Sequence, residues 1–170
     1  SRQLVCACTA CALLFDGLEG GKYKRISDRA RFLPDFALTD GQWDSLIIPI
    51  NMAFFFYSSR ERRTIAYYHS PAGAVESMLP LETWNSIVEN NPVLKEMHSD
   101  TEALLVNRIR RPGNSGGYYI APMDQCYRLV GLIRGNWKGL SGGAEVWDEI
   151  DGFFAELRAR AAGGPGGGHA

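Results

Sequence analysis

Long apolar runs in the first half of the chain and amphipathic segments in the second half predict strands followed by helices. Residues 48–59 and 63–70 are rich in Ile, Phe and Tyr, and the charged turn between them makes the pair typical of a β-hairpin. Residues 73–79 follow another turn and are expected to add an antiparallel strand. We expect these strands to form the centre of a sheet.

Helix start signals stand in the middle of the chain. Thr39 and Gln42 have the spacing of a capping box, in which each side chain binds the other residue's backbone amide. Pro80 favours the first turn of a second helix, whose apolar face includes Trp84. The pair Asn91–Pro92 then predicts the start of a further short helix.

The segment 99–111 is compatible with both helix and strand. Ser99 and Glu102 repeat the capping-box spacing, and the run Glu-Ala-Leu-Leu favours helix. We therefore predict a helix in this segment. A loop at 112–117 and a strand at 118–122 are expected to follow it.

Two amphipathic helices are expected at the C-terminal end. Asp124 is placed to cap a helix over residues 124–138, and Ser141 is placed to cap the last helix. In the last helix Trp147 and Phe154 lie seven residues apart on the apolar face. Both are predicted to be core residues.

The segregation of strands and helices predicts an α+β fold with a mainly antiparallel sheet, a β-meander, packed with helices. Short strands at 2–6, 12–15 and 22–27 are expected to form an N-terminal cysteine knuckle. The chain then divides into half of a zinc-knuckle-like segment at 1–26, an α+β domain at 27–160 and a disordered Gly-rich tail at 161–170.

Composition narrows the classes of partner. The 170 residues, 45% of them hydrophobic, suffice for one domain with a core. The net charge of −1 gives no reason to expect a nucleic acid or an acidic membrane as partner. No apolar stretch reaches the ~18 residues that a transmembrane helix needs. The first residue is Ser, so we expect the chain to be a piece of a longer protein.

Three closely spaced cysteines give the strongest chemical signal. The spacing Cys8-x-x-Cys11 places two thiolates on one turn, where both reach one tetrahedral zinc ion, and Cys6 is a candidate third ligand. The same motif is compatible with a redox thiol pair, because it lowers a thiol pKa, and with simple packing. Candidates for a fourth ligand are His69, His98, Cys126 and Asp16.

The other cysteine and the histidines are expected to have structural roles. Cys126 lies on the apolar face of its helix and is predicted to be a small buried hydrophobe. His69 and His98 lie near the ends of elements and are expected to be caps or surface residues. Because the cysteine spacing favours metal or thiol chemistry over disulfides, we expect a cytoplasmic location.

A second candidate surface lies on the polar face of the penultimate helix. Asp124, Arg128 and Lys138 share this face with two glycines, and Ser141 follows at the start of the last helix. Glycine is costly on an exposed helix face, by roughly 1 kcal/mol relative to alanine, which indicates close packing of another helix or a partner. The alternative is an enzyme with a pocket between Asp124, Arg128 and the 139–143 turn.

Several stretches together resemble a bacterial family of uncharacterised proteins that is associated with gene clusters for nickel–iron hydrogenases. They include CACTACALLFD (6–16), LPDFALTDGQW (33–43), SPAGAVES (70–77) and CYRLVGLIRGNW (126–137). The resemblance implies a further Cys-x-x-Cys upstream of this chain, which would complete a four-cysteine zinc site with Cys8 and Cys11. It also implies a protein partner, a hydrogenase or one of its maturation proteins.

The sequence therefore favours a non-enzymatic accessory or interaction protein linked to hydrogenase assembly or function. An enzyme that uses the Asp124 and Arg128 region, and a thiol redox protein that uses Cys8 and Cys11, remain as alternatives. Nothing in the pattern specifies a reaction, a substrate or an oligomeric state.

Overall fold

The computed structural model describes residues 5–15, 23–112, 116–139 and 142–163. Within these residues one antiparallel sheet has the strand order β1-β6-β5-β2-β3-β4. The strands are β1 (Arg31–Phe32), β2 (Met52–Ser58), β3 (Arg63–Ser70), β4 (Gly73–Ser77), β5 (Glu102–Asn107) and β6 (Gly117–Pro122). The helices are α1 (Thr9–Phe15), α2 (Asp40–Ser45), α3 (Leu81–Asn90), the 3-10 helix η1 (Pro92–Glu96), α4 (Met123–Asn136) and α5 (Gly143–Ala162).

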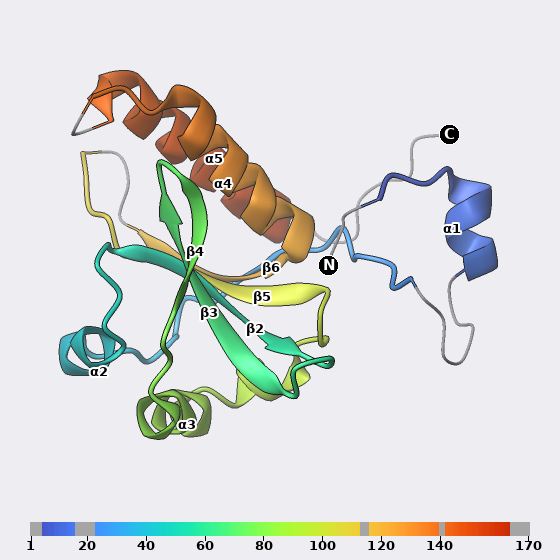
Figure 1. Ribbon diagram of the computed structural model, residues 1–170, viewed down its shortest axis with the longest axis horizontal. Coiled ribbons are helices and arrows are strands. Elements are labelled where there is room, and N and C mark those ends of the chain that lie inside the picture. The colour runs from blue at the N-terminus through green and yellow to red at the C-terminus, as the bar shows by residue number, and fades with distance from the viewer. Residues whose placement is uncertain (1–4, 16–22, 113–115, 140–141, 164–170) are drawn as a thin grey trace.

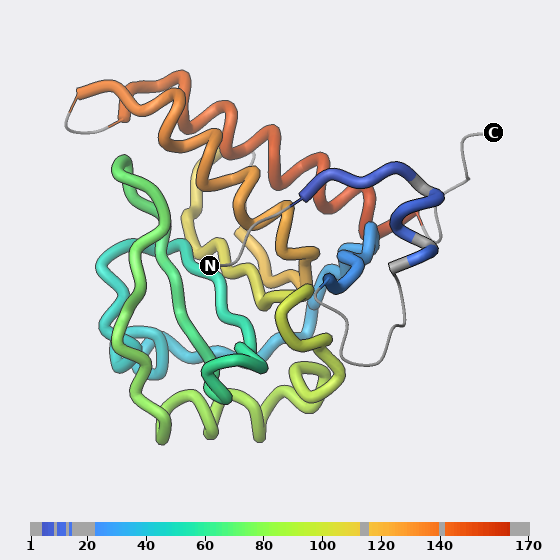
Figure 2. The backbone as a smooth tube through the Cα atoms, turned by 45° about the vertical axis from the view of Figure 1, so that its right-hand side comes forward, coloured from blue at the N-terminus to red at the C-terminus, as the bar shows by residue number. Residues whose placement is uncertain are grey.

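Helices cover both faces of the sheet. Helices α4 and α5 lie side by side on one face, and α2 and α3 lie on the other (Figure 1). The predicted α+β class with a mainly antiparallel sheet is confirmed. Backbone views from two directions show that the segment carrying α1 lies outside these layers (Figures 1 and 2).

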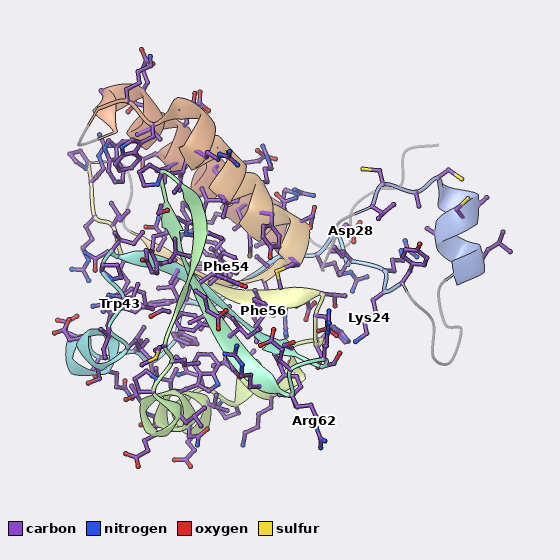
Figure 3. The ribbon with its side chains drawn as sticks, viewed as in Figure 1. Lys24, Asp28, Trp43, Phe54, Phe56 and Arg62 are labelled. Carbon is purple, nitrogen blue, oxygen red and sulfur yellow. The ribbon has the colours of Figure 1, made fainter. Side chains whose placement is uncertain are left out.

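The alternation of side chains along β2 divides the core into two clusters. Phe54 and Phe56 face α4 and α5, where they pack with Leu129 and Ile150. Phe55 points to the opposite face and stacks on Trp84 of α3, with ring centroids 5.1 Å apart. Figure 3 shows Phe54 and Phe56 at the middle of the sheet. Because both faces are covered, β2 needs no polar alternation, which explains its continuous apolar run.

The helix predicted for 99–111 is wrong, because this segment contains strand β5. All six residues of β5 are buried between β2 and β6. The carboxylate of Glu102 does reach back, but it accepts from the backbone N–H of His98 at 2.9 Å in a turn, and does not close a helical capping box. Burial of the apolar run on two faces outweighs the helix propensity of Glu, Ala and Leu, which is a weak force compared with tertiary packing.

The predicted meander is only partly the centre of the sheet. Strands β2 and β3 lie inside it, but β4 forms an edge, and β5 takes the place beside β2. The predicted strand at 118–122 is confirmed as part of β6.

Two predicted helix starts have different outcomes. The capping box at α2 is confirmed, since Gln42 N donates to Thr39 Oγ1 at 3.1 Å and Thr39 N donates to Gln42 Oε1 at 3.0 Å. Asp124 does not cap α4, which begins at Met123 without a side-chain cap.

The last helix is preceded by a left-handed residue. Gly142 has φ 86°, and a Cβ there would lie 2.8 Å from the side chain of Val146, so this position requires glycine. Ser141, the predicted cap, lies outside the described residues. Helix α5 continues to Ala162 and Gly163 follows it, so the expected tail is helical at its start; residues 164–170 lie outside the described residues.

The N-terminal strands are not observed in the described residues. Residues 12–15 belong to helix α1, because Ala and Leu in this stretch favour helix, and residues 23–27 have no regular structure. Most of the expected strand at 2–6 lies outside the described residues. Within the ranges given above, no helix combines the length and the apolar character that crossing a bilayer demands.

Candidate functional site

The predicted metal ligands lie on an N-terminal arm, residues 5–15, beside the domain (Figure 2). Cys6 and Cys8 are exposed and Cys11 is half-buried, and all of them are free thiols. Helix α1 begins directly after Cys8 and includes Cys11. The predicted cysteine turn is therefore the first turn of a helix.

One hydrogen bond sets the geometry of the cysteine pair. The backbone N–H of Cys11 donates to Cys8 Sγ at 3.4 Å, while Ala12 N donates to the Cys8 carbonyl at 2.9 Å. The bond from Cys11 lowers the pKa of the Cys8 thiol below its ordinary value, because it stabilises the thiolate. The thiolate is the form that binds a metal or attacks a disulfide.

The pair fits half of a zinc site. Two thiolates on one turn supply two of the four ligands that a structural zinc ion takes. Within the described ranges, no group of at least three Cys, His, Asp or Glu side chains is gathered where it would hold an ion. Cys6 is thus not placed as a third ligand by the chain alone.

The candidate fourth ligands are placed elsewhere. His69 and Cys126 are buried in the domain, with exposed fractions of 3% and 0%. His98 lies 3.1 Å from the Glu102 carboxylate, measured from Nδ1. Asp16 lies outside the described residues. The prediction that Cys126 is buried is confirmed, while the expectation that His69 is a cap or surface residue is wrong.

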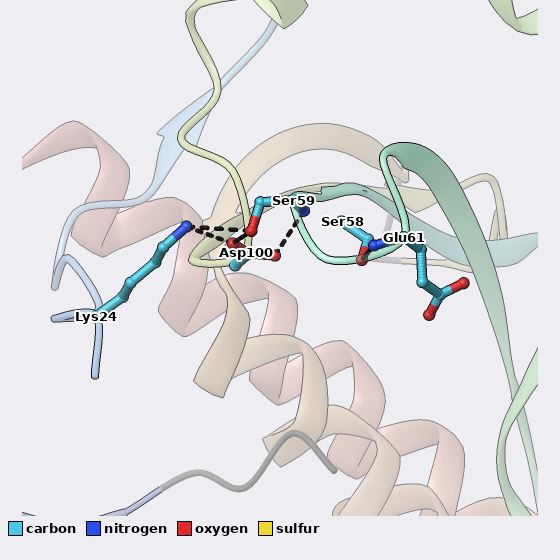
Figure 4. A network of polar contacts seen from close by, with 5 residues as sticks. All are labelled: Lys24, Ser58, Ser59, Glu61 and Asp100. Carbon is cyan, nitrogen blue, oxygen red and sulfur yellow. Dashed lines mark hydrogen bonds and ion pairs between the residues drawn. The ribbon is translucent and has the colours of Figure 1, made fainter. Parts of the chain in front are cut away.

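A polar network ties the chain that follows the arm to the domain (Figure 4). Lys24 forms an ion pair with Asp100, and Asp100 also accepts from the backbone N–H of Ser59 at 3.0 Å and from its hydroxyl. Burial alone would raise the pKa of Asp100, but Lys24 and Ser59 outweigh it and hold this pKa below its ordinary value. The network therefore holds Lys24, and the chain around it, beside the β2–β3 turn.

The second predicted surface is not one site. Asp124 lies in the first turn of α4 and Lys138 lies beyond its last turn, so roughly 20 Å of helix separates them. Arg128 forms a two-bond ion pair with Glu156 of α5, at 3.0 and 2.8 Å, and Lys138 pairs with Glu145. These pairs hold α4 against α5 and its preceding turn.

Sequence reasoning missed a cleft at one end of the sheet. Asn107 ends β5 and Tyr118 lies in β6, while Phe32 of β1 and Arg158 of α5 close the side. The cleft is also lined by Leu33, Pro34, Asp40, Asn51, Arg108, Arg110, Gly116 and Gly117. Only the cluster of arginines at 108–111 was visible as a signal in the sequence.

Comparison with known proteins places the chain in a family. The chain belongs to a family of unknown function, DUF5947, whose model matches residues 1–161. The match includes the cysteine arm, the domain and the cleft, and it confirms the expectation of an uncharacterised family. No curated protein and no solved structure matches the chain.

Proposed function

We propose that this member of the family is a non-enzymatic interaction protein whose N-terminal arm carries half of a zinc site and binds a protein partner. The supporting observation is the arm itself, which presents the free thiols of Cys6, Cys8 and Cys11 beside the core. A fold that needed these cysteines for its own stability would bury them in the domain, as it buries Cys126.

In this proposal Cys8 and Cys11 hold the ion. Zinc supplies no redox chemistry here; as a structural ion it contributes folding free energy to the chain around it. The remaining ligands come from outside the described residues, and the upstream Cys-x-x-Cys that the family resemblance implies is the proposed source. The arm is thus ordered by the completed site and by Lys24.

Exposed apolar side chains on and beside the arm support a protein partner. Val5, Leu14 and Tyr23 have exposed fractions of 64%, 72% and 52%. Exposed large apolar side chains are a feature of interaction surfaces where they lie close together, and these three lie within one stretch of the sequence. We propose that the partner is a nickel–iron hydrogenase or one of its maturation proteins, in the cytoplasm.

A capture experiment tests the proposal. The tagged protein is used to recover partners from cells that make hydrogenase, in parallel with the variants Leu14→Glu and Cys8→Ser/Cys11→Ser. Met78→Glu is the matched control, because Met78 is 89% exposed but lies between β4 and α3. The proposal expects both arm variants to lose the hydrogenase component and the control to retain it. Equal recovery by all four proteins would contradict an interaction through the arm.

A second candidate function is a thiol redox protein. The lowered pKa of the Cys8 thiol favours it, since a thiolate attacks disulfides. It requires Cys8 and Cys11 to form a reversible disulfide, as the disulfide of a partner is reduced to two thiols. The two thiols lose two hydrogens in this step, which a thiol trap with mass spectrometry detects. If the two thiols stay alkylatable at redox potentials that oxidise glutathione, this function is excluded.

A further inference from the structure

The cleft at the end of β5, which the sequence did not predict, has the size of a small-molecule site. Its volume is ≈ 400 Å³, within the range of roughly 300–1,000 Å³ typical of ligand pockets. It opens where β5 ends and β6 begins, and Gly116 approaches the Asn107 carbonyl there so closely that a Cβ would lie 2.6 Å from that oxygen. A side chain at Gly116 would therefore disturb the floor of the cleft.

The lining carries an excess of positive charge. Three guanidinium groups, those of Arg108, Arg110 and Arg158, line the cleft with the carboxylate of Asp40. Arg108 forms an ion pair with Asp40. Arg110 and Arg158 are exposed, and neither has a carboxylate partner in the part of the chain that the structure describes. The positive charge is therefore local to the cleft, because the whole chain has a net charge of −1.

The lining of the cleft includes a buried donor that has no acceptor among the described residues. Asn107 has an exposed fraction of 1%, and its Oδ1 accepts from the backbone N–H of Ile109 at 3.0 Å. Its Nδ2 has no hydrogen-bond partner among the described residues. Buried amide donors are nearly always paired, so this one calls for an acceptor at the floor of the cleft.

Part of the cleft lining is an apolar wall. Phe32, Leu33 and Pro34 form it together with Tyr118. The guanidinium carbon of Arg158 lies 4.1 Å from the centre of the Phe32 ring, a cation–π contact beside these apolar side chains. A guanidinium group presents N–H donors that match the two oxygens of a carboxylate or phosphate.

We propose that this cleft binds a small organic anion, whose phosphate or carboxylate group lies on Arg110 and Arg158 with an oxygen accepting from Asn107. The planar or apolar part of the ligand then packs on the wall at Phe32 and Tyr118. This site is separate from the cysteine arm, because the network of Lys24 and the cleft lie at opposite ends of β5.

The test measures binding of two anionic probes and one neutral probe by titration calorimetry at fixed ionic strength. Phenyl phosphate and phthalate carry the two candidate anionic groups on the same ring, and benzyl alcohol is the neutral probe. The variant Arg110→Gln/Arg158→Gln removes two charges from the cleft. The control Arg60→Gln/Arg134→Gln removes two exposed charges elsewhere and therefore changes the net charge equally.

We expect at least one of the anionic probes to bind the native chain and benzyl alcohol not to bind. The cleft variant should weaken binding at least tenfold, the size of one charged hydrogen bond, while the control binds as the native chain does. The anion that binds more tightly identifies the class of the natural ligand. The variant Asn107→Asp, checked for native circular dichroism, places a negative charge in the cleft. It should also bind the anionic probe more weakly than the native chain does, by repulsion.

Two outcomes would overturn the proposal. The first is that neither phenyl phosphate nor phthalate binds the native chain at millimolar concentration. The second is that the cleft variant and the control lose affinity equally, which would show that the anions respond to overall charge alone. Neither outcome bears on the cysteine arm, so the two proposals fail independently.

Discussion

At the scale of single residues, His69 is a buried polar side chain in an apolar environment. Its ring lies 5.5 Å from that of Phe54, and neither of its nitrogens has a hydrogen-bond partner among the described residues. Burial lowers the pKa of His69 to about 4, and the nearby backbone of Met52 and Cys126 only partly opposes this shift. The folded state therefore holds the ring neutral.

Acid should destabilise the protein through this residue. The unfolded chain binds a proton at His69 near pH 6.5, while the folded chain does so only near pH 4, so stability falls as the pH falls between these values. Over this interval the free energy of unfolding should fall by about 3 kcal/mol, because each pKa unit of difference is worth about 1.4 kcal/mol. Urea unfolding at a series of pH values should show that His69→Leu lacks this decline.

The matched control is His98→Gln, because the side chain of His98 is 76% exposed. This variant should keep the acid-sensitive profile of the native protein. A native profile that is flat between pH 6.5 and 4 would show that the buried ring finds a partner that keeps it charged.

A second residue-scale prediction concerns Asp100. Asp100→Asn keeps a residue type that tolerates the observed φ of 69° but removes the ion pair with Lys24. Hydrogen exchange of residues 23–30 should accelerate, while global stability falls by no more than about 1 kcal/mol, because the Lys24 partner is half exposed and an asparagine still accepts from Ser59. Asp44→Asn, at an exposed site in α2, is the control. Unchanged exchange in 23–30 would refute the tethering role of Asp100.

The residues that line the cleft could not be predicted as one site from the sequence. Arg110 and Arg158 lie far apart in the chain and meet only because α5 packs against β1. No spacing rule connects them. The Cys8 and Cys11 pair was predictable because its geometry is local, and the structure adds only the hydrogen bond that joins them.

At the scale of elements, α5 confirms one predicted core residue and qualifies the other. Phe154 is 3% exposed and packs on Tyr119 and Phe153. Trp147 is only partly buried, at the edge of the cluster, where its ring meets Trp137. Helical periodicity predicts that both side chains lie on the inner face of α5. It does not predict how far the sheet extends beneath the helix, and therefore how deeply each side chain is buried.

The two residues should therefore differ in their contribution to stability. Phe154→Ala should cost about 3–5 kcal/mol, the range for a buried aromatic side chain. Trp147→Ala should cost clearly less, because part of its ring is already in contact with water. Urea unfolding of both variants at pH 7 measures the difference. A larger loss for Trp147→Ala would show that the edge of the cluster is the better packed part.

Strand β5 and helix α1 mark the limits of local sequence signals. Both segments contain Ala and Leu, and the β5 segment also follows the capping-box spacing of Ser99 and Glu102. β5 becomes a strand because β2 and β6 flank it, and α1 becomes a helix on an arm that no strand accompanies in the described residues. Where tertiary contacts decide, propensity alone is too weak to choose. The α2 start and the β2–β3 hairpin are local and were predicted correctly.

At the scale of the whole molecule, two distinct surfaces lie at the two ends of the sheet. Lys24, which follows the cysteine arm in the chain, is held beside the β2–β3 turn (Figure 4). The arginine cleft opens where β5 ends. Between them the two core clusters fill both faces of the sheet. The domain therefore has core enough to fold without a metal ion, and the ion's effect should be confined to the arm.

The most direct test of the central proposal is the zinc content of the protein that includes the upstream segment, purified under reducing conditions. We predict that Cys8→Ser/Cys11→Ser loses about one zinc equivalent per site, as expected for a four-ligand ion, while residues beyond 30 still unfold cooperatively. Cys126→Ala, which removes a buried thiol, should keep the zinc. A native protein without zinc, or a double variant that retains it, would contradict the account.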